Sequence, residues 1–406
     1  MEYIYINAGS SVAIEKSEDG KQVEKIFIDG KQHKFEDGDV QDKEQFAAQM
    51  KRNKYQKFLN RQFENLLVLT GAGSSVSVGE GEKKGRLLSQ LWDDTRDKLG
   101  ENKLNAFCEL VKYSDKKDDA YVKNLEKLLS VANAAKDFVT STKDINIPTI
   151  IEEIEALIKE KCELKLPHDA PHHAFIEKIT RRKVTLPRAK VFTLNYDTLF
   201  EQAGRKGNFT IIDGFSFSFP RYFSGRNFDY DVVLRDKSRL KEEDNFINRV
   251  FHLYKPHGSV DWEKTKEGVK QADSVKKALM IYPKDSKYES SYEQPFFEMM
   301  SRFQQNLRRD NVLLICIGFS FNDKHIVTAI QEALEQNSGF QIMVLNKGID
   351  TSSSFKWLFD LSMNHSNIVL MDELFSDFAL NYPTLKSYNQ DEYKKITINL
   401  SDSDGE

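Results

Sequence analysis

The stretch that decides the fold reads Leu66-Leu67-Val68-Leu69-Thr70-Gly71-Ala72-Gly73-Ser74-Ser75. Its apolar first half is typical of a strand that is buried on both faces of a parallel sheet. The glycines that follow at once allow a tight turn and a close approach of the backbone to a ligand. A polar segment and a helical pattern come next, so we expect a strand, a glycine-rich loop and a helix. Free N–H groups and the positive end of a helix dipole would then face an anion, which makes this loop a candidate site for a nucleotide diphosphate.

The same residues, taken alone, also fit a simple turn between a strand and a helix, because short glycine motifs occur by chance.

The composition of the chain indicates which classes of function are disfavoured, but it does not identify one. The 406 residues carry 59 Lys and Arg against 63 Asp and Glu, a net charge of −4, which gives no electrostatic argument for nucleic acid or a membrane surface. No apolar run approaches the roughly 20 residues that span a bilayer. The first residues lack a basic segment followed by an apolar one, so we expect no secretory signal and a cytoplasmic protein.

The three cysteines, Cys108, Cys162 and Cys316, lie far apart in the sequence and form no C-x-x-C pair. A zinc site of four cysteines is therefore excluded within this chain, and a reducing compartment fits.

Three regions follow from the patterns along the chain. Residues 1–42 are predicted to form a small β-rich extension in which Asp29-Gly30 signals a hairpin turn. So short a meander needs a neighbour, either the main domain or another subunit, and is a candidate assembly contact. Residues 43–385 form the main domain, with a helical insertion at about 76–185. Residues 386–406 are polar and acidic, and a disordered tail is expected.

The main domain alternates strands and helices, which predicts an α/β fold with a Rossmann-like, doubly wound parallel sheet. Besides the opening strand, the expected strands are 191–194, 209–212, 251–254, 312–317, 341–345 and 368–371. In such a sheet, ligands bind beyond the carboxyl ends of the strands, near the switch in strand order. Five of these ends are polar or glycine-rich and would face one crevice: Gly71-Ala72-Gly73-Ser74, Thr193-Leu194-Asn195-Tyr196-Asp197, His257-Gly258, Gly318-Phe319-Ser320 and Asn346-Lys347.

These five segments, in this order, resemble the motifs of the sirtuin (silent information regulator) family of enzymes that consume NAD. The resemblance covers roughly residues 66–372 without the helical insertion. It implies that His257-Gly258 corresponds to the catalytic HG motif and that Asn346 meets the adenosine ribose. Two of the motifs, read with the residues that follow them, look most like the bacterial anti-phage branch, whose members hydrolyse NAD. They are Thr193-Leu194-Asn195-Tyr196-Asp197-Thr198-Leu199-Phe200-Glu201 and Gly318-Phe319-Ser320-Phe321-Asn322-Asp323. The extension and the length resemble the sirtuin-like subunit that assembles with a HerA-type ATPase.

The resemblance implies NAD as substrate, no metal in this chain, a homo-oligomer and a possible HerA-type ATPase or helicase partner. It implies neither a membrane nor a sequence-specific nucleic-acid partner. Sirtuin deacylases carry a small zinc ribbon of four cysteines, which this chain cannot build, and the helical insertion is larger here. Both differences disfavour protein deacylation. Deacylation stays an alternative, as does a regulatory module that binds NAD or ADP-ribose without cutting it. The candidate catalytic residues are Asn195 and His257. The candidate NAD-binding residues are Gly71, Ala72, Gly73, Ser74, Thr193, Asp197, Gly318, Phe319, Ser320, Asn346 and Lys347.

Each candidate has a chemical reason and an alternative. The amide of Asn195 both donates and accepts, so it suits a water or a ribose hydroxyl, and its alternative is a helix cap, a role that Asp197 could also take. His257 can act as a general base near neutral pH, although a lone histidine is more often a structural hydrogen-bonder. Ser74 and Ser320 are placed to bind phosphates, and Lys347 is either charge near the ribose or solvated.

Two further segments are assigned structural roles. Asp323 is predicted to cap the helix that follows it. The histidines His168, His172 and His173 lie near Cys162, but their spacing matches no strong metal signature.

Overall fold

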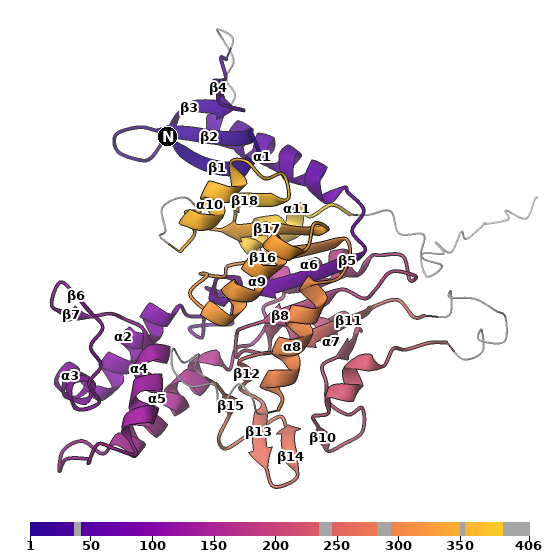
Figure 1. The fold of residues 1–406 in the computed structure, drawn as a ribbon. Helices are drawn as coiled ribbons and strands as arrows, with labels where there is room; N and C mark the ends of the chain where they lie inside the picture. The colour runs from indigo at the N-terminus through magenta and orange to yellow at the C-terminus, as the bar shows by residue number, and fades with distance from the viewer. Residues whose placement is uncertain (36–41, 235–245, 282–293, 350–353, 385–406) are drawn as a thin grey trace, which may run out of the picture.

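The computed structural model describes residues 1–35, 42–234, 246–281, 294–349 and 354–384. It confirms a Rossmann-like α/β fold built on one eleven-stranded sheet (Figure 1). The predicted tail at 386–406 lies outside the described residues. In order across the sheet, the strands are β4 (Lys31–Gln32), β3 (Val23–Ile28), β2 (Ser10–Lys16), β1 (Glu2–Asn7), β18 (Ile368–Asp372), β17 (Phe340–Asn346), β16 (Val312–Ile317), β5 (Asn65–Thr70), β8 (Lys190–Thr193), β11 (Val250–Tyr254) and β9 (Thr210–Ile212).

The strands from β18 to β9 pair in parallel, and β5 occupies the middle of this parallel part. The chain leaves β5 for β8 on one side and returns later to β16 on the other side. The strand order therefore switches between β5 and β16. In doubly wound sheets a crevice opens at such a switch, beyond the carboxyl ends of the two strands.

Alternate residues of the buried strands face two different cores, as the period of two requires. Leu66 and Val68 of β5 pack on one side, and Leu67 and Leu69 pack on the other. The first face is covered by α1 (Lys43–Leu59), α6 (Pro171–Thr180), α7 (Leu199–Lys206) and α11 (Phe375–Asn381). The second face is covered by α8 (Phe296–Leu307), α9 (Lys324–Gln336) and α10 (Lys356–Ser362).

The N-terminal extension continues the main sheet rather than forming a separate layer. Strand β1 pairs antiparallel with β18, with Tyr5 opposite Met371. The predicted turn at Asp29-Gly30 joins β3 to β4, and both residues have the positive φ that this hairpin needs. The sequence patterns did not predict β2, whose side chains are mostly buried between its neighbours.

The helical insertion has a core of its own. It comprises α2 (Leu88–Leu99), α3 (Glu101–Leu110), the ribbon β6 (Lys116–Lys117) with β7 (Ala120–Tyr121), α4 (Leu125–Ala135) and α5 (Ile147–Cys162). Figure 1 shows these helices as a group beside the sheet, away from β1–β4. Their apolar core also takes in Tyr196 and Val260, which belong to loops at the sheet's carboxyl edge. The insertion is therefore packed directly against the predicted site.

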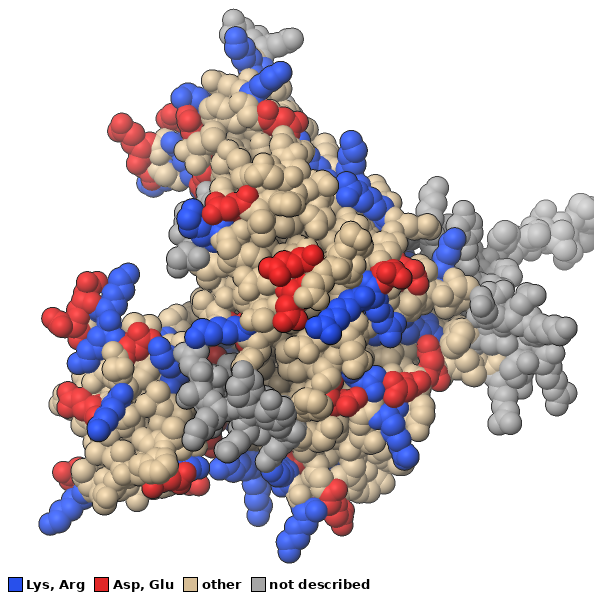
Figure 2. Space-filling model, in the orientation of Figure 1, with Lys and Arg blue, Asp and Glu red and all other residues tan. Residues whose placement is uncertain are grey.

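The remaining elements are short; the first follows β5, and the others come before or after β11 in the chain. They are η1 (Ala72–Ser74), η2 (Gly225–Asp229), β10 (Arg221–Tyr222), β12 (Gly258–Ser259), β13 (Trp262–Thr265), β14 (Gly268–Gln271) and β15 (Leu279–Met280). Within the described residues, no helix combines the length and the apolar character needed to cross a membrane. On the face drawn in Figure 2, the described basic and acidic side chains are interspersed.

Candidate active site

A cavity of about 850 Å³ lies at the switch point, between the carboxyl ends of the strands and the helical insertion. Its volume is in the range of ordinary ligand sites. The sheet side contributes most of the predicted residues: Gly71, Ala72, Gly73, Asn195, Asp197, His257, Gly318, Phe319, Ser320 and Asn346. The opposite wall comes from the loop before α2, from α4 and from the end of α5. The five strand ends that looked alike in the sequence thus do lie around one cavity.

The two glycine loops pack backbone against backbone. A Cβ on Gly73 would lie 2.6 Å from the Cα of Gly318, and one on Gly318 would lie 2.4 Å from the Cα of Gly73. Gly71 N–H donates to the Ile317 carbonyl and Gly73 N–H to the Gly318 carbonyl, each at 3.0 Å. These glycines therefore allow the loops after β5 and β16 to meet, in addition to any approach of a ligand.

The expected anion cradle at this loop needs correction. Only the three-residue η1 follows Gly71, and the next full helix, α2, begins at Leu88, so no helix dipole points out of the loop. The N–H groups of Gly71, Gly73, Ser74 and Ser75 are all used in backbone hydrogen bonds. Within the described residues, only the Ala72 N–H of this loop lacks such a partner. A diphosphate would therefore rely mainly on side chains of the cavity.

The close contact of the two loops gives a stability prediction. Gly318→Ala is expected to lower the free energy of unfolding, because the new Cβ meets Gly73 and because φ is +58°. Gly81 has the same φ of +58° but nothing within 4 Å, so Gly81→Ala is the matched control. The control should lose about 1–2 kcal/mol from the backbone conformation alone, and Gly318→Ala about 1–3 kcal/mol more from the clash. Equal losses in denaturant titrations would contradict the packing argument.

Asn195 is held by its amide nitrogen. Nδ2 donates to the Gly71 carbonyl at 3.0 Å, to Ser75 Oγ at 2.8 Å and to Ser74 Oγ at 3.1 Å. These bonds fix the orientation of the amide, since the oxygen cannot donate. The side chain lines the cavity, and Oδ1 is the atom left to accept a hydrogen bond there. Asn195 therefore offers the cavity an acceptor, whereas the sequence had suggested both a donor and an acceptor.

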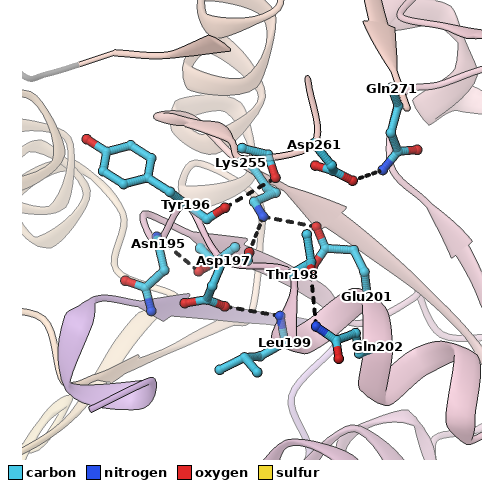
Figure 3. Close-up of polar contacts among 12 residues, drawn as sticks. Asn195, Tyr196, Asp197, Thr198, Leu199, Glu201, Gln202, Lys255, Asp261 and Gln271 are labelled. Atoms are coloured by element: carbon cyan, nitrogen blue, oxygen red, sulfur yellow. Dashed lines mark hydrogen bonds and ion pairs between the residues drawn. The ribbon is translucent and has the colours of Figure 1, made fainter. Parts of the chain in front are cut away.

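Asp197 acts on Asn195 through Ser75. The hydroxyl of Ser75 donates to Asp197 Oδ2 at 2.7 Å while it accepts from Asn195. The other carboxylate oxygen accepts the N–H of Leu199 at 3.1 Å and so holds the start of α7 (Figure 3). Asp197, considered in the sequence as a possible helix cap, therefore holds both the loop of Asn195 and the first helical N–H of α7, although the N-cap position itself is Thr198.

His257 is paired with Asp323. Its Nε2 lies 3.0 Å from Asp323 Oδ2, and the two side chains are only 11% and 9% exposed. The other carboxylate oxygen caps α9, as predicted, by accepting the N–H of His325 at 2.9 Å and that of Ile326 at 3.3 Å. In the neutral imidazole, the carboxylate keeps the proton on Nε2 and leaves Nδ1 as the basic nitrogen. The pairing with His257 was missed in the sequence because a capping residue needs no further partner.

Charge sets the protonation of this pair. Burial alone would lower the pKa of His257, but the bond to Asp323 and the charges of Asp323 and Glu126 raise it above its ordinary value. Burial alone would raise the pKa of Asp323, but His257 and the two N–H donors lower the pKa of that carboxyl below its ordinary value. The contribution of this pair to folding stability is therefore fully present at pH values between the ordinary pKa of Asp and the ordinary pKa of His. It is lost as pH rises through the raised pKa of His257 or falls through the lowered pKa of Asp323.

An acid from the helical insertion joins this cluster. Glu126, in the first turn of α4, lines the cavity and contacts the Tyr196 hydroxyl at 3.1 Å. The same hydroxyl donates to the Ile281 carbonyl at 2.9 Å. Desolvation raises the pKa of Glu126, despite the opposing charge of His257. No motif in the insertion pointed to Glu126, because only the tertiary packing of α4 brings it to the cavity.

Three predicted residues do not line the cavity. The Ser74 hydroxyl is buried, donates to the Gly71 carbonyl at 2.9 Å and accepts from Asn195, so it supports the loop and is not aimed at a phosphate. Thr193 Oγ1 accepts the N–H of Asn195 at 3.2 Å. The Lys347 backbone donates to Asn346 Oδ1 at 3.0 Å. Their contribution is to hold residues that do line the site.

The other strand-end residues differ in how accessible they are. Ser320 is exposed on the cavity wall, where its hydroxyl suits a phosphate or a sugar. Asn346 lines the cavity, but its Nδ2 donates to the Phe319 carbonyl at 2.9 Å, which joins the ends of β16 and β17.

Of the three histidines near α6, His172 packs within the core. His172 is fully buried, with its ring edge-on to Phe200 and Phe375. Desolvation lowers the pKa of His172 to about 3, so the ring is neutral. In the part of the chain that the structure describes, no group of three or more His, Cys, Asp or Glu side chains is arranged to hold a metal ion.

The fold is a Rossmann-like α/β domain whose crevice at the switch in strand order is lined by an asparagine and a histidine. Residues 189–357 match the model of the SIR2-like domain family, and this match contains Asn195, His257, Gly318 and Asn346. SIR2-like domains use NAD as a substrate, so the match supports a sirtuin-like protein with NAD-related chemistry. A comparison with curated proteins finds no match to this chain.

The pairing of His257 with Asp323 predicts a specific pH dependence. Asp323→Asn removes the charge that raises the pKa of His257, so the titration midpoint of this histidine should move to lower pH. If His257 acts as a base in its neutral form, the acid limb of activity moves in the same direction. Histidine NMR titration measures the first shift, and the pH profile of whatever NAD-dependent activity the protein has measures the second. A midpoint that stays at the wild-type value would contradict the pairing.

Proposed function

We propose that this protein is an NAD⁺ glycohydrolase that cleaves the bond between nicotinamide and ribose to give nicotinamide and ADP-ribose. One observation carries the proposal. Asn195 and His257, from the ends of two neighbouring strands, line one large cavity at the switch point, within the segment that matches the SIR2-like model.

The chemistry asks little of the protein beyond position. Nicotinamide departs neutral and takes the electrons of the glycosidic bond, which leaves an oxocarbenium-like ribose. Asn195 Oδ1 accepts a hydrogen bond from the attacking water or from a ribose hydroxyl. As the water oxygen bonds to the ribose carbon, its proton passes to Nδ1 of His257 and then to solvent. The balance is NAD⁺ plus water giving ADP-ribose, nicotinamide and a proton.

The proposal extends to biological role on the strength of the motif resemblance. The forms around Asn195 and Ser320 support an anti-phage effector that depletes NAD in the cytoplasm, working as an oligomer, with a HerA-type ATPase as candidate partner. Free NAD hydrolysis would harm the cell, so we expect assembly to restrain the activity. The candidate contact surfaces are the extension β1–β4 and the helical insertion.

The test is release of nicotinamide from NAD by the purified chain, alone and mixed with a HerA-type ATPase. We expect nicotinamide and ADP-ribose in equal amounts in at least one of these states. No release in any state would overturn the hydrolase proposal in favour of a module that only binds the nucleotide. Turnover that appears only when an acyl-lysine peptide is added would instead identify a deacylase. Light scattering that finds only monomer, with and without the ATPase, would contradict the assembly proposal.

A further inference from the structure

Lys255 is a buried cation that the proposed chemistry does not use. It follows β11 directly and lies two residues before His257, and its side chain is only 2% exposed. Burying an ammonium group is unfavourable unless it is paired and hydrogen-bonded. The groups that pair with Lys255 should therefore indicate its structural role.

Both partners belong to the segment that carries Asn195. The Nζ of Lys255 donates to the backbone carbonyl of Asp197 and lies 3.0 Å from Glu201 Oε1 in the first turn of α7. Figure 3 shows the Lys255 side chain reaching between Asp197 and Glu201. One side chain of the histidine segment is thus bound at two points to the asparagine segment.

The ladder between β8 and β11 ends just before these two segments. Strands β8 and β11 are paired up to Phe192 and Tyr254, and the two segments extend beyond that point. Besides Lys255, hydrogen bonds join the two segments from the Val260 N–H to the Tyr196 carbonyl at 3.0 Å and from Ser259 Oγ to the same carbonyl at 3.3 Å, and Tyr196 and Val260 also share an apolar core. Among these described contacts, Lys255 makes the only ionic one.

Stability is a poor explanation for this pair. A buried ion pair loses solvation, and an apolar pair of similar volume is often as stable or more stable. Glu201 shows this penalty, since burial raises its pKa to about 7 despite the charge of Lys255. Its second oxygen, Oε2, has no hydrogen-bond partner within the described residues. An apolar pair would not supply a donor to the Asp197 carbonyl. The hydrogen bond from Lys255 to this carbonyl fixes the loop after Asn195.

We propose that Lys255 is a positioning residue that, with Glu201, sets the placement of Asn195 relative to His257. The proposal rests on NAD hydrolysis as the activity of this site. It implies that losing Lys255 lowers kcat while KM for NAD changes little, because the residue does not line the cavity.

The experiment compares two buried lysines with similar partners. Lys255→Met keeps the length and apolar body of the side chain but removes the donor. Lys255→Met/Glu201→Gln also removes the remaining buried acid, so the double variant should regain stability. The control is Lys51→Met with Glu373→Gln. Lys51 likewise donates to a backbone carbonyl, that of Asp372, and lies 3.2 Å from the carboxylate of Glu373, whose side chain is 10% exposed, but neither Lys51 nor Glu373 lines the cavity.

We expect kcat to fall by about 10–10²-fold in both Lys255 variants. The double variant should unfold at nearly the wild-type denaturant midpoint, and the Lys51 pair should keep the wild-type kcat. Wild-type kcat in the folded Lys255 double variant would overturn the proposal, as would recovery of activity in proportion to stability.

A readout independent of turnover separates this proposal from the proposed function. In NMR spectra of histidine-labelled protein, the His257 signal should shift or broaden in the Lys255 variants and stay in place in the Lys51 variants. An inactive wild type would overturn NAD hydrolysis, and the His257 signal would still decide the positioning role. An unmoved signal in the Lys255 double variant would overturn it.

Discussion

Replacing His257 by glutamine is expected to reduce kcat for NAD cleavage by about 10²–10⁴-fold, the usual contribution of a general base. Glutamine has a similar reach and can still donate to Asp323, which keeps its bonds to the N terminus of α9. The fold and the cavity should therefore persist. What is lost is a group that takes up a proton near neutral pH, since an amide is not basic.

The measurement is nicotinamide release under saturating NAD, paired with calorimetry of ADP-ribose binding. His257→Gln should bind ADP-ribose about as tightly as the wild type, and its residual activity should lose the acid limb of the pH profile. The control is His365→Gln, an exposed histidine in the turn before β18, which should leave kcat unchanged. Full activity in His257→Gln would show that another group accepts the proton.

The sequence predicted the architecture well because local patterns carry it. Residues 66–69 and 312–317 are continuous apolar runs, and such runs form strands buried on both faces of a parallel sheet. The carboxyl ends of parallel strands meet at one edge, so the polar residues after each run had to lie near one another. Asn195 and His257 could therefore be expected at one crevice from the sequence alone.

The sequence was less informative about what each polar group contacts. The glycines at 71, 73 and 318 indicated a close approach, but the pattern does not distinguish a ligand from another backbone segment. Asp323 was expected to be a cap, which used one of its oxygens, and the partner of the other oxygen lies 66 residues upstream. Glu126 reaches the cavity only through the packing of α4. These contacts are tertiary, so no local spacing encodes them.

The amide of Asn195 has two roles that mutation can separate. Its nitrogen binds the loop through the Gly71 carbonyl and Ser75 Oγ, and its oxygen is the atom of this cavity-lining side chain that can accept a hydrogen bond from a ligand. Losing the nitrogen leaves a buried carbonyl with one partner fewer, which costs about 1–3 kcal/mol of folding free energy. Losing the oxygen removes an acceptor for the water or ribose hydroxyl, which matters only for turnover.

Asn195→Ala is therefore expected to lower kcat by at least about 10²-fold, as the loss of one preorganised polar group in a reaction centre does, with only a modest loss of stability. Ser75→Ala is the graded comparison, because it removes the link from Asp197 to Asn195 but leaves the amide oxygen in place. Its kcat should lie between those of the wild type and Asn195→Ala. Urea titrations measured beside nicotinamide release separate folding from chemistry. Activity lost equally in the two variants would assign the effect to loop structure, and activity retained in Asn195→Ala would move the reaction centre elsewhere in the cavity.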